Sequence, residues 1–359
     1  MKLFINNIMG KAGGQVTRIR SLNSTDPELR RCVTVFCSSI DVSLGPDIIQ
    51  KEVKIPFIPL FFVSILFEFF FLPFVLKKHN IRQNLYINLS NFSLPIACKC
   101  QKILGVSNAL IFDNSQNSKA IKYWILYILF HLSQYFIDKN VFLSMHCLKM
   151  ANASPFKLKP SVVIHNGVSE FWYERKWSRN LENSQKLKLL YVSHGYYYKN
   201  HRFLLNYINK LKASIDIGIE LNLVGYFKAD IKKSLENHAN LIGIRDNVKF
   251  HAQSDRYEIR NLLLSSTFVI YPSDVENCPN ALLEASASGI TCIVPNKQPY
   301  IEFNQSNFIY FEPLNIESAV RCTVDRFKLE KVSLQETRKE HVNLTWSDFW
   351  DNIISEGLE

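Results

Sequence analysis

Short apolar runs alternate with amphipathic stretches along the second half of the chain. The apolar runs have the length and composition of buried strands, and they cover residues 187–193, 219–225, 247–252, 267–273 and 291–296. Between them lie stretches with helical spacing, at residues 201–214, 230–241, 255–266 and 279–288. This alternation predicts a parallel sheet with helices on both faces. In such a sheet, ligands bind at the carboxyl ends of the strands.

The first half shows a fainter version of the same pattern, with strands expected at 2–8, 32–39, 84–90 and 109–114. Residues 161–168 end in Asn-Gly, a turn signal, and charged and polar residues follow. We therefore predict an α/β protein with a first domain at 1–168, a linker at 169–186 and a second domain at 187–340. A last helical stretch within 341–359 is expected to pack back on the first domain.

A strongly apolar stretch at residues 55–78 admits three interpretations. Pro59 and Pro73 leave only 13 residues between them, and a helix of that length is about 20 Å long, short of the roughly 30 Å core of a bilayer. Glu68 also lies inside the stretch, where lipid would disfavour a carboxylate. A transmembrane span is thus the weakest interpretation. A helix on a membrane surface and a core helix, with Ser64 and Glu68 forming one polar edge, both remain open.

A second aromatic segment, at residues 121–136, raises the same question. Its tyrosines and tryptophan suit the boundary between water and lipid, and packing in a core explains them almost as well. The sequence alone does not decide whether either segment touches lipid.

The excess positive charge is confined to the first half. Residues 1–170 hold 19 lysines and arginines against 9 acidic residues, whereas residues 171–359 hold 23 of each. This asymmetry indicates either an anionic partner or a merely solvated basic surface. No nucleic-acid motif accompanies it, so the partner that we expect is an anionic membrane surface. The eight cysteines show no CxxC spacing, which predicts free thiols in a reducing cytoplasm.

The segment SDVENCPNALLEASASG, at residues 273–289, places two glutamates eight positions apart. Pro279 suits the first turn of a helix, where its missing N–H costs nothing. Glu276 would then lie in the loop after a strand, and Glu284 about a turn and a half into the helix. Amides near residues 280–282 would form an anion site between them. Two glutamates alone are usually surface charges, but this arrangement would hold the hydroxyls and phosphates of a nucleotide-sugar.

With its surroundings, this segment resembles the donor-binding segment of glycosyltransferase family 4 (group 1), retaining enzymes of the GT-B fold. LLYVSHGYYYKNH, at 189–201, is similar to the family's first donor-domain strand and loop, in which Lys199 matches the diphosphate-binding lysine. MGKAGGQVTR resembles the glycine-rich loop that faces donor and acceptor, carried here by Gly13 and Gly14, although a plain tight turn also explains it. Asn91 occupies the polar position of a helix–strand–Asn unit found in one branch.

The resemblance implies two Rossmann-like domains whose parallel sheets face a central cleft, with the acceptor bound by the first and the donor by the second. Glu276 and Lys199 would be the catalytic residues. The donor-binding residues would be His194, Asn277, Cys278, Pro279, Asn280, Ala281, Leu282 and Glu284. A hexose-type sugar would be transferred with retention, the donor's own phosphate assisting the acceptor hydroxyl. No cofactor or metal is expected, because Asp274-Val-Glu276 is the nearest approach to an Asp-x-Asp pair.

Some residues depart from the family pattern. His194 stands where an arginine is usual, and Asn277-Cys278 replaces Gly-Phe. Asp113 and Asn114 stand where many members carry a histidine at the end of a strand. His165 is interpreted as part of the linker region rather than as a catalyst.

The expected acceptor is a glycan, carried on a lipid, in the synthesis of a cell-surface polysaccharide such as lipopolysaccharide or O-antigen. The enzyme would work in the cytoplasm, at the inner face of the cell membrane. Two alternatives remain. One is an inverting transferase or nucleotide-sugar epimerase of the same fold, with a base such as Asp113 or His131. The other is a non-catalytic, membrane-docked partner of a transferase.

Overall fold

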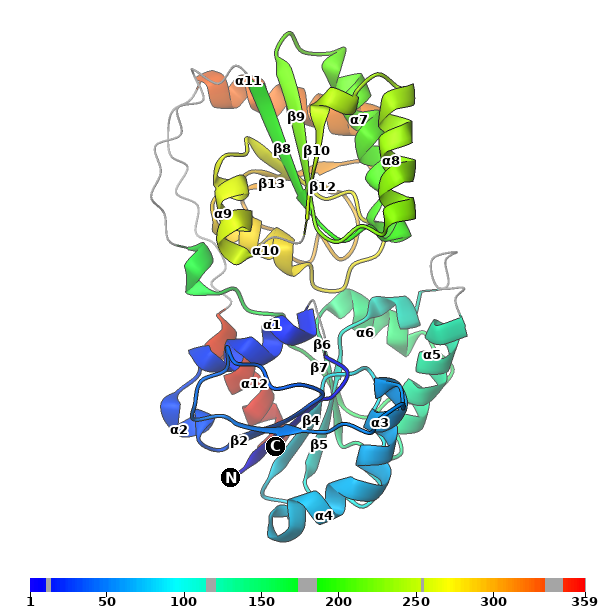
Figure 1. The fold of residues 1–359 in the computed structure, drawn as a ribbon, viewed down its shortest axis with the longest axis vertical. Coiled ribbons are helices and arrows are strands. Elements are labelled where there is room, and N and C mark those ends of the chain that lie inside the picture. Colours follow the sequence, from blue (N-terminus) through cyan, green and yellow to red (C-terminus); the bar gives the residue numbers. More distant parts are fainter. Residues whose placement is uncertain (11–13, 114–120, 174–185, 253–254, 333–344, 359) are drawn as a thin grey trace. The chain divides into compact units, whose positions relative to one another are not determined.

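The computed structural model describes residues 1–10, 14–113, 121–173, 186–252, 255–332 and 345–358 (Figure 1). The chain divides into two compact units: Met1–Ser169 with Asn343–Glu359, called unit 1, and Glu170–Val342, called unit 2. The segment expected as a linker, 169–186, is therefore divided between the two units. Ser169 falls in unit 1, Glu170 begins unit 2, and residues 174–185 lie outside the described residues.

The sheet of unit 1 is parallel throughout, in the order β3-β2-β1-β4-β5-β6-β7. Its strands are β1 (Leu3–Asn7), β2 (Val33–Cys37), β3 (Ile49–Glu52), β4 (Leu85–Asn88), β5 (Gln101–Val106), β6 (Lys139–Phe142) and β7 (Ser161–Val163). Leu3 of β1 lies opposite both Val33 and Leu85. The strand order therefore reverses between β1 and β4, which is the switch point of a doubly wound sheet.

Residues 109–114 do not form the strand that their apolar character predicts. The strand is β5, and Ala109–Ile111 form a short 3-10 turn. Asn108 caps this turn, because its Oδ1 accepts from the amide of Leu110 at 3.1 Å. Both stretches are buried, so hydrophobicity did not distinguish them. Asp113 accordingly follows a turn rather than a strand, and Asn114 lies outside the described residues.

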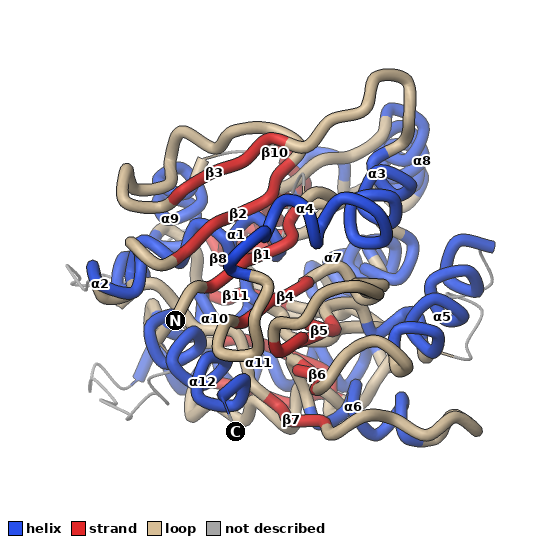
Figure 2. The backbone as a smooth tube through the Cα atoms, turned by 90° about the horizontal axis from the view of Figure 1, so that it is seen from below, coloured by secondary structure: helices blue, strands red, loops and turns tan. Residues whose placement is uncertain are grey.

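Helices cover both faces of this sheet. They are α1 (Gly14–Arg20), α2 (Pro27–Arg30), α3 (Leu60–Leu66), α4 (Leu72–Leu76), α5 (Ile121–Ser133), α6 (Met145–Asn152) and α12 (Trp346–Leu358). Figures 1 and 2 show α2 and α12 to one side of the strands and α3 and α5 to the other.

The last helix, α12, belongs to unit 1 although it follows unit 2 in sequence. Trp350 is fully buried, and its indole Nε1 donates to Ser21 Oγ at 2.9 Å. Lys139 Nζ lies 2.9 Å from Glu356 Oε2. A Cβ on Gly357 would come within 2.7 Å of Leu85 on β4, so the helix lies close against the sheet.

The apolar helix after β3 runs from Leu60 to His79, so the expectation that the prolines confine it to 13 residues is wrong. A π-helical turn, η2 (Phe67–Phe71), lies just before Pro73, and the amide of Leu72 donates to the carbonyl of Phe67. This wider turn accommodates the proline, whose ring clashes with the carbonyl four residues back in a regular α-helix. By length and composition alone this helix could cross a membrane. Of its most apolar stretch of 18 residues, 33% is buried inside the protein.

The polar edge of this helix points inward. Glu68 is completely buried, and its carboxylate accepts hydrogen bonds from Asn6 Nδ2 (3.1 Å), Tyr86 Oη (2.7 Å), Asn88 Nδ2 (2.5 Å), Ser93 Oγ (2.8 Å) and the Leu94 amide (2.6 Å). Burial raises the pKa of Glu68, and the hydrogen bonds from Leu94, Tyr86, Asn88 and Ser93 act in the opposite direction. Because Glu68 and Ser64 face the sheet, Phe69, Phe70, Phe71 and Phe74 are left exposed.

Unit 2 holds a second parallel sheet, in the order β10-β9-β8-β11-β12-β13. Its strands are β8 (Lys186–Val192), β9 (Gly218–Val224), β10 (Val248–His251), β11 (Phe268–Ile270), β12 (Cys292–Pro295) and β13 (Phe308–Phe311). Its helices are α7 (His201–Lys212), α8 (Ala229–Leu241), α9 (Arg256–Leu264), α10 (Asn280–Ala287) and α11 (Ile316–Val332). The strand order reverses between β8 and β11.

Replacing Glu68 by alanine is expected to destabilise unit 1 strongly. The change leaves several buried donors without an acceptor, and each unsatisfied group costs about 1–3 kcal/mol, so we expect a total loss of roughly 3–5 kcal/mol. Urea unfolding measures it. The matched control is Glu28→Ala in α2, where the side chain is exposed and the change should stay within about 0.5 kcal/mol. Equal, small effects of both changes would contradict this account.

Candidate active site

The switch point of unit 2 gathers the two segments that the sequence singled out. The loop after β8 carries His194 and Lys199, and the loop after β11 carries Glu276. β8 and β11 are neighbours in the sheet. Because the carboxyl ends of parallel strands share one edge, and ligands bind where the strand order reverses, both loops lie where a ligand is expected.

Lys199 and Glu276 form an ion pair across this edge. Lys199 Nζ lies 2.5 Å from Glu276 Oε1, and the two side chains are 17% and 11% exposed. An ammonium and a carboxylate at this distance hold each other in one geometry. A ligand with negative phosphates and sugar hydroxyls could bind both groups, since the phosphate attracts the ammonium and the hydroxyls donate to the carboxylate.

The hydroxyl of Tyr191, the side chain of Asn200 and one backbone hydrogen bond hold the two loops together. Tyr191 Oη lies 2.8 Å from Ser273 Oγ and donates to the carbonyl of Lys199 at 3.0 Å. Asn200, which adopts a left-handed backbone conformation, donates from Nδ2 to the carbonyl of Pro272 at 2.9 Å. Asp274 donates its amide to the carbonyl of Tyr198 at 2.8 Å. These bonds fix the backbone on both sides of the ion pair.

The helix α10 begins at Asn280, and Pro279 occupies the N-cap position without a side-chain hydrogen bond to the helix. The amides of Leu282 and Leu283 both donate to the carbonyl of Pro279 at 3.0 Å. The amide of Leu282 is therefore already used, which corrects the expectation that it is available to an anion. Asn280 and Ala281 form the opening turn of the helix, and Asn277 and Cys278 lie between it and Glu276. The positive end of the helix dipole thus points to the edge that carries the ion pair.

Glu284 lies one turn into α10, beside Trp172, which belongs to the segment that the sequence predicted as a linker. Glu284 is half-buried, and burial raises the pKa of Glu284 to about 8. A hydrogen bond with the Trp172 side chain opposes this shift. The Trp172 carbonyl also accepts from Ser288 Oγ at 3.1 Å. Near neutral pH this carboxyl is therefore protonated, and it can both donate and accept a hydrogen bond.

His194 occupies the start of the loop after β8. Its Nδ1 accepts from the amide of Tyr226 at 3.0 Å. Burial, and next the charge of Lys199, lower the pKa of His194, so the ring is neutral. A neutral ring that accepts at Nδ1 carries its proton on Nε2. His194 can thus donate one hydrogen bond to a ligand, although it lacks the permanent charge of an arginine.

Gly14 and Asn91 belong to unit 1 and lie at its own switch point. Gly14 is the first residue of α1, after β1, and Gly13 lies outside the described residues. Gln15 Nε2 donates to the carbonyl of Leu89 at 2.8 Å, which places the start of α1 next to the segment after β4. In that segment Asn91 Oδ1 accepts from the amides of Ser107 and Asn108, at 2.6 and 2.8 Å. Asn91 therefore orders the carboxyl edge of this sheet.

Sequence reasoning missed two residues of the unit 2 site. Tyr271, directly after β11, is 3% exposed, and its hydroxyl has no hydrogen-bond partner within the described residues. Burial is the largest cause that raises the pKa of Tyr271, and Glu284 and Glu276 both add to it, so this hydroxyl lies near both carboxylates. Lys297 Nζ lies 3.3 Å from Asp274 Oδ1 and adds a second cation. The position of Tyr271 directly after a predicted strand was the sequence feature that could have indicated its place in the site.

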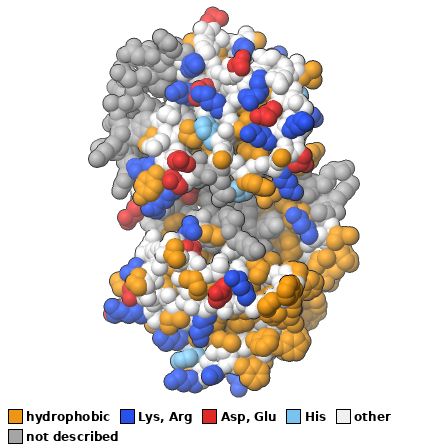
Figure 3. Space-filling view, viewed as in Figure 1, with side chains coloured by type: hydrophobic (Ala, Val, Ile, Leu, Met, Phe, Trp, Pro, Cys, Tyr) orange, Lys and Arg blue, Asp and Glu red, His pale blue; other side chains and the backbone are white. Residues whose placement is uncertain are grey.

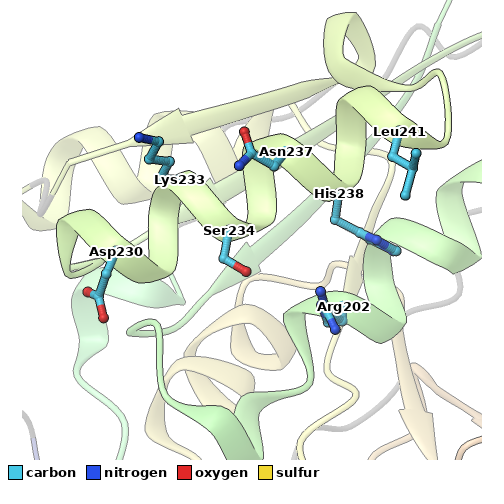
Figure 4. Close-up of a pocket in the computed structure, with 7 residues that line it drawn as sticks. All are labelled: Arg202, Asp230, Lys233, Ser234, Asn237, His238 and Leu241. Carbon is cyan, nitrogen blue, oxygen red and sulfur yellow. The ribbon is translucent and has the colours of Figure 1, made fainter.

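Unit 2 also has a pocket of about 510 Å³, which does not belong to this site (Figure 4). It lies along α8 and is shared with Arg202 of α7. None of the residues predicted for the site lines it. In Figure 4, Lys233 points away from Asp230, on the opposite side of α8, so the two charges do not converge on one ligand.

Comparison with known proteins identifies the class of unit 2. Residues 174–340 match the family described as glycosyl transferases group 1. The capsular polysaccharide biosynthesis glycosyltransferase CapH of Staphylococcus aureus is 27% identical over 205 residues, which are 56% of this chain and 53% of CapH. The chain thus spans about half the length of this curated relative.

Solved structures extend the likeness to both units. Sucrose-phosphate synthase from Thermosynechococcus elongatus has a TM-score of 0.77 at 14% identity, covering 99% of this chain and 98% of that one. HepE from Anabaena, in complex with UDP and glucose, has a TM-score of 0.68 at 16% identity, covering 100% and 96%. The predicted GT-B fold is therefore confirmed: two Rossmann-like units, each with a parallel sheet and flanking helices.

The raised pKa of Glu284 predicts a pH-dependent stability of unit 2. The folded state keeps this proton up to about pH 8, whereas an unfolded glutamate loses it near 4.5. Folding is therefore favoured most below about 4.5 and less as the pH rises to about 8. We expect the melting temperature of the wild type to fall more steeply across this window than that of Glu284→Gln, which cannot titrate. Parallel melting curves of the two proteins would contradict the assignment.

Proposed function

We propose that this chain is a retaining glycosyltransferase that moves a hexose-type sugar from a nucleotide-sugar to a glycan acceptor. The observation that carries the proposal is the Lys199–Glu276 pair at the switch point of a group 1 glycosyltransferase domain. HepE, which shares the fold, was crystallised with UDP and glucose. CapH, by its name, acts in capsular polysaccharide biosynthesis. Synthesis of a cell-surface polysaccharide is the process that we propose for this chain.

Each site residue has a role in this proposal. Lys199 neutralises the departing diphosphate, helped by the Nε2–H of His194 and by backbone amides at the opening turn of α10. Glu276 accepts hydrogen bonds from sugar hydroxyls once the diphosphate has drawn Lys199 away. Glu284 binds the ribose hydroxyls. The lysine, the amides and the helix end supply the positive charge that the leaving group requires, so the proposed reaction uses no metal and no cofactor.

The proton of the acceptor hydroxyl goes to the donor's own phosphate in the proposed mechanism. The rival mechanism, an inverting transferase or an epimerase, places a protein base in unit 1. His131 is poorly placed for that role, because it lies near the end of α5, shortly before β6 begins. It is therefore on the amino side of the sheet, away from the ligand-binding edge. Asp113, after the 3-10 turn, is the remaining candidate for such a base.

Unit 1 presents a surface that suits a membrane, which supports a lipid-linked acceptor. We define its apolar face by its exposed members from two helical segments: Phe69, Phe70, Phe71, Phe74, Ile121, Trp124, Ile125, Ile128, Leu132 and Tyr135. Ser93 joins the segments, since its hydroxyl donates to Glu68 and its amide donates to Ser133 Oγ at 2.8 Å. Figure 3 shows apolar side chains gathered on the side of unit 1 that carries α3, α4 and α5.

The apolar face reverses the usual arrangement of a surface helix. Glu68 is buried while Phe74 is 76% exposed and Trp124 66% exposed. Exposed Lys77, Lys78 and Lys122 adjoin these aromatic groups. Aromatic groups and lysines together are typical of a surface that rests on an anionic bilayer. We therefore propose a cytoplasmic enzyme that is peripheral at the inner face of the membrane, in keeping with its eight free cysteines.

Nucleotide-sugars are expected to stabilise the wild type against heat. A panel of UDP-, GDP- and ADP-sugars would be tested by thermal shift, and the donor would then be tested for turnover. The shift should vanish in Glu284→Ala if the ribose binds there. Stabilisation without any turnover would favour the non-catalytic alternative, and no stabilisation by any donor would refute the proposed function.

Loss of Lys199 should affect transfer selectively. Lys199→Ala removes the charge that faces the diphosphate, and we expect the rate of sugar transfer to fall about 10²–10³-fold. Lys249→Ala is the matched control, because Lys249 pairs with Glu220 at 2.6 Å within the same unit but away from the switch point. Similar transfer rates in both variants would show that Lys199 has no catalytic role.

Charges placed on the apolar face should weaken vesicle binding. Phe70→Asp and Phe74→Asp are each expected to lower the affinity for vesicles of anionic phospholipid about tenfold or more, since each removes an aromatic group and adds a repelled charge. Sedimentation with vesicles measures it. Leu241→Asp is the control, because Leu241 is 83% exposed but lies on α8 of unit 2. Unchanged binding of the two phenylalanine variants would rule out this face as the docking surface.

A further inference from the structure

A groove of about 1080 Å³ runs along α5 on unit 1. Its other wall is the segment at residues 156–160, which leads into β7. Pockets that bind small molecules are typically about 300–1,000 Å³ and mostly apolar. Here the lining includes Trp124, Tyr127, Ile128, Leu132, Tyr135 and Phe156. The groove therefore has the size and lining of a site for an apolar ligand.

A buried histidine without a partner lines the groove. His131 is 7% exposed, and its ring lies 4.4 Å from the rings of both Tyr127 and Phe156. Neither ring nitrogen has a hydrogen-bond partner in the part of the chain that the structure describes. Buried polar atoms are nearly always satisfied in proteins. A ligand oxygen at this place would satisfy the histidine.

Two lysines give the groove its charge. Lys157 and Lys159 line the same wall, both are exposed, and neither forms an ion pair with any described carboxylate. No aspartate or glutamate is among the lining residues. The groove thus combines an apolar surface with uncompensated positive charge, which complements a molecule that has an alkyl chain and an anionic head.

The groove opens onto the apolar face of unit 1. Trp124, Ile128, Leu132 and Tyr135 belong to both. The segment 156–160 precedes the amino end of β7 and His131 lies near the end of α5, so this end of the groove lies away from the carboxyl edge where a parallel sheet binds its substrate. It is therefore separate from the switch point of this unit.

We propose that the groove binds a membrane lipid with a phosphate head group, its chain along α5 and its phosphate at His131, Lys157 and Lys159. The inference shares with the proposed function only the membrane association of unit 1. It adds a specific lipid site to a surface that would otherwise adhere to any anionic bilayer.

Dodecyl phosphate, below its micelle concentration, is the probe. Of the four tryptophans within the described residues, Trp124 lines the groove and is exposed, whereas Trp172, Trp346 and Trp350 are buried. Trp177, outside the described residues, would be replaced by phenylalanine, so that the tryptophan fluorescence reports on Trp124. We expect saturable binding, about tenfold tighter than that of dodecyl maltoside, which has the same chain without charge. Inorganic phosphate should give no response. Equal affinity for both amphiphiles, or no saturable change, would overturn the proposal.

Variants separate the groove from the rest of the apolar face. Ile128→Asp should abolish binding of dodecyl phosphate. Lys157→Gln with Lys159→Gln, at two exposed positions that leave the fold intact, should remove the preference over dodecyl maltoside. Phe74→Asp, outside the groove, should keep dodecyl phosphate binding while losing vesicles. Wild-type affinity in both groove variants would overturn the site.

Thermal shifts with the nucleotide-sugar panel on the same samples keep the two proposals apart. Donor binding without dodecyl phosphate binding would overturn only the groove. Dodecyl phosphate binding without any donor response would support the groove while refuting the proposed transfer.

Discussion

The buried carboxylate of Glu68 determines how unit 1 meets its surroundings. Five donors from the sheet and the loop after β4 converge on it, and a carboxylate so enclosed can face only inward. The helix that carries it must then turn its phenylalanines outward, because residues on opposite sides of a helix cannot both face the core. The exposed aromatic groups are therefore a consequence of an interior polar contact. That contact also explains why a helix of transmembrane length remains part of a folded α/β unit.

In unit 2, the order of the parallel strands determines where the candidate site lies. The reversal between β8 and β11 brings together two loops whose key residues are 77 positions apart in sequence. Lys199 and Glu276 then neutralise each other at the ligand-binding edge, and the tyrosine and asparagine bonds hold their loops. In the proposed function, these paired charges bind the phosphates and hydroxyls of one ligand. The half-buried Glu284, protonated near neutral pH, supplies a neutral group where a second full charge would be costly.

The two units differ in the surfaces that they offer. Unit 2 carries the polar site, whereas unit 1 carries the apolar face and the groove beside it. The proposed transfer, from a water-soluble donor to an acceptor held at a membrane, would use both surfaces. The helix α12 packs on unit 1 through the hydrogen bond of Trp350 and the ion pair of Lys139 with Glu356. Unit 1 therefore contains both the first strand and the last helix.

The sequence by itself determined the alternation of strands and helices in unit 2, the place of Glu276 before a helix, and the resemblance to glycosyl transferases group 1, because these depend on local hydrophobic periodicity and on contiguous motifs. It misplaced the strand at 109–114, since β5 and the turn after it are equally apolar. It also stopped a helix at Pro73, because the π-helical turn that tolerates this proline depends on packing. Only the tertiary structure decided which way Glu68 points, that Lys199 pairs with Glu276, and that Trp172 and Tyr271 lie beside the carboxylates. Those relations join residues far apart in the chain, and they arise from strand order and burial, which no local pattern records.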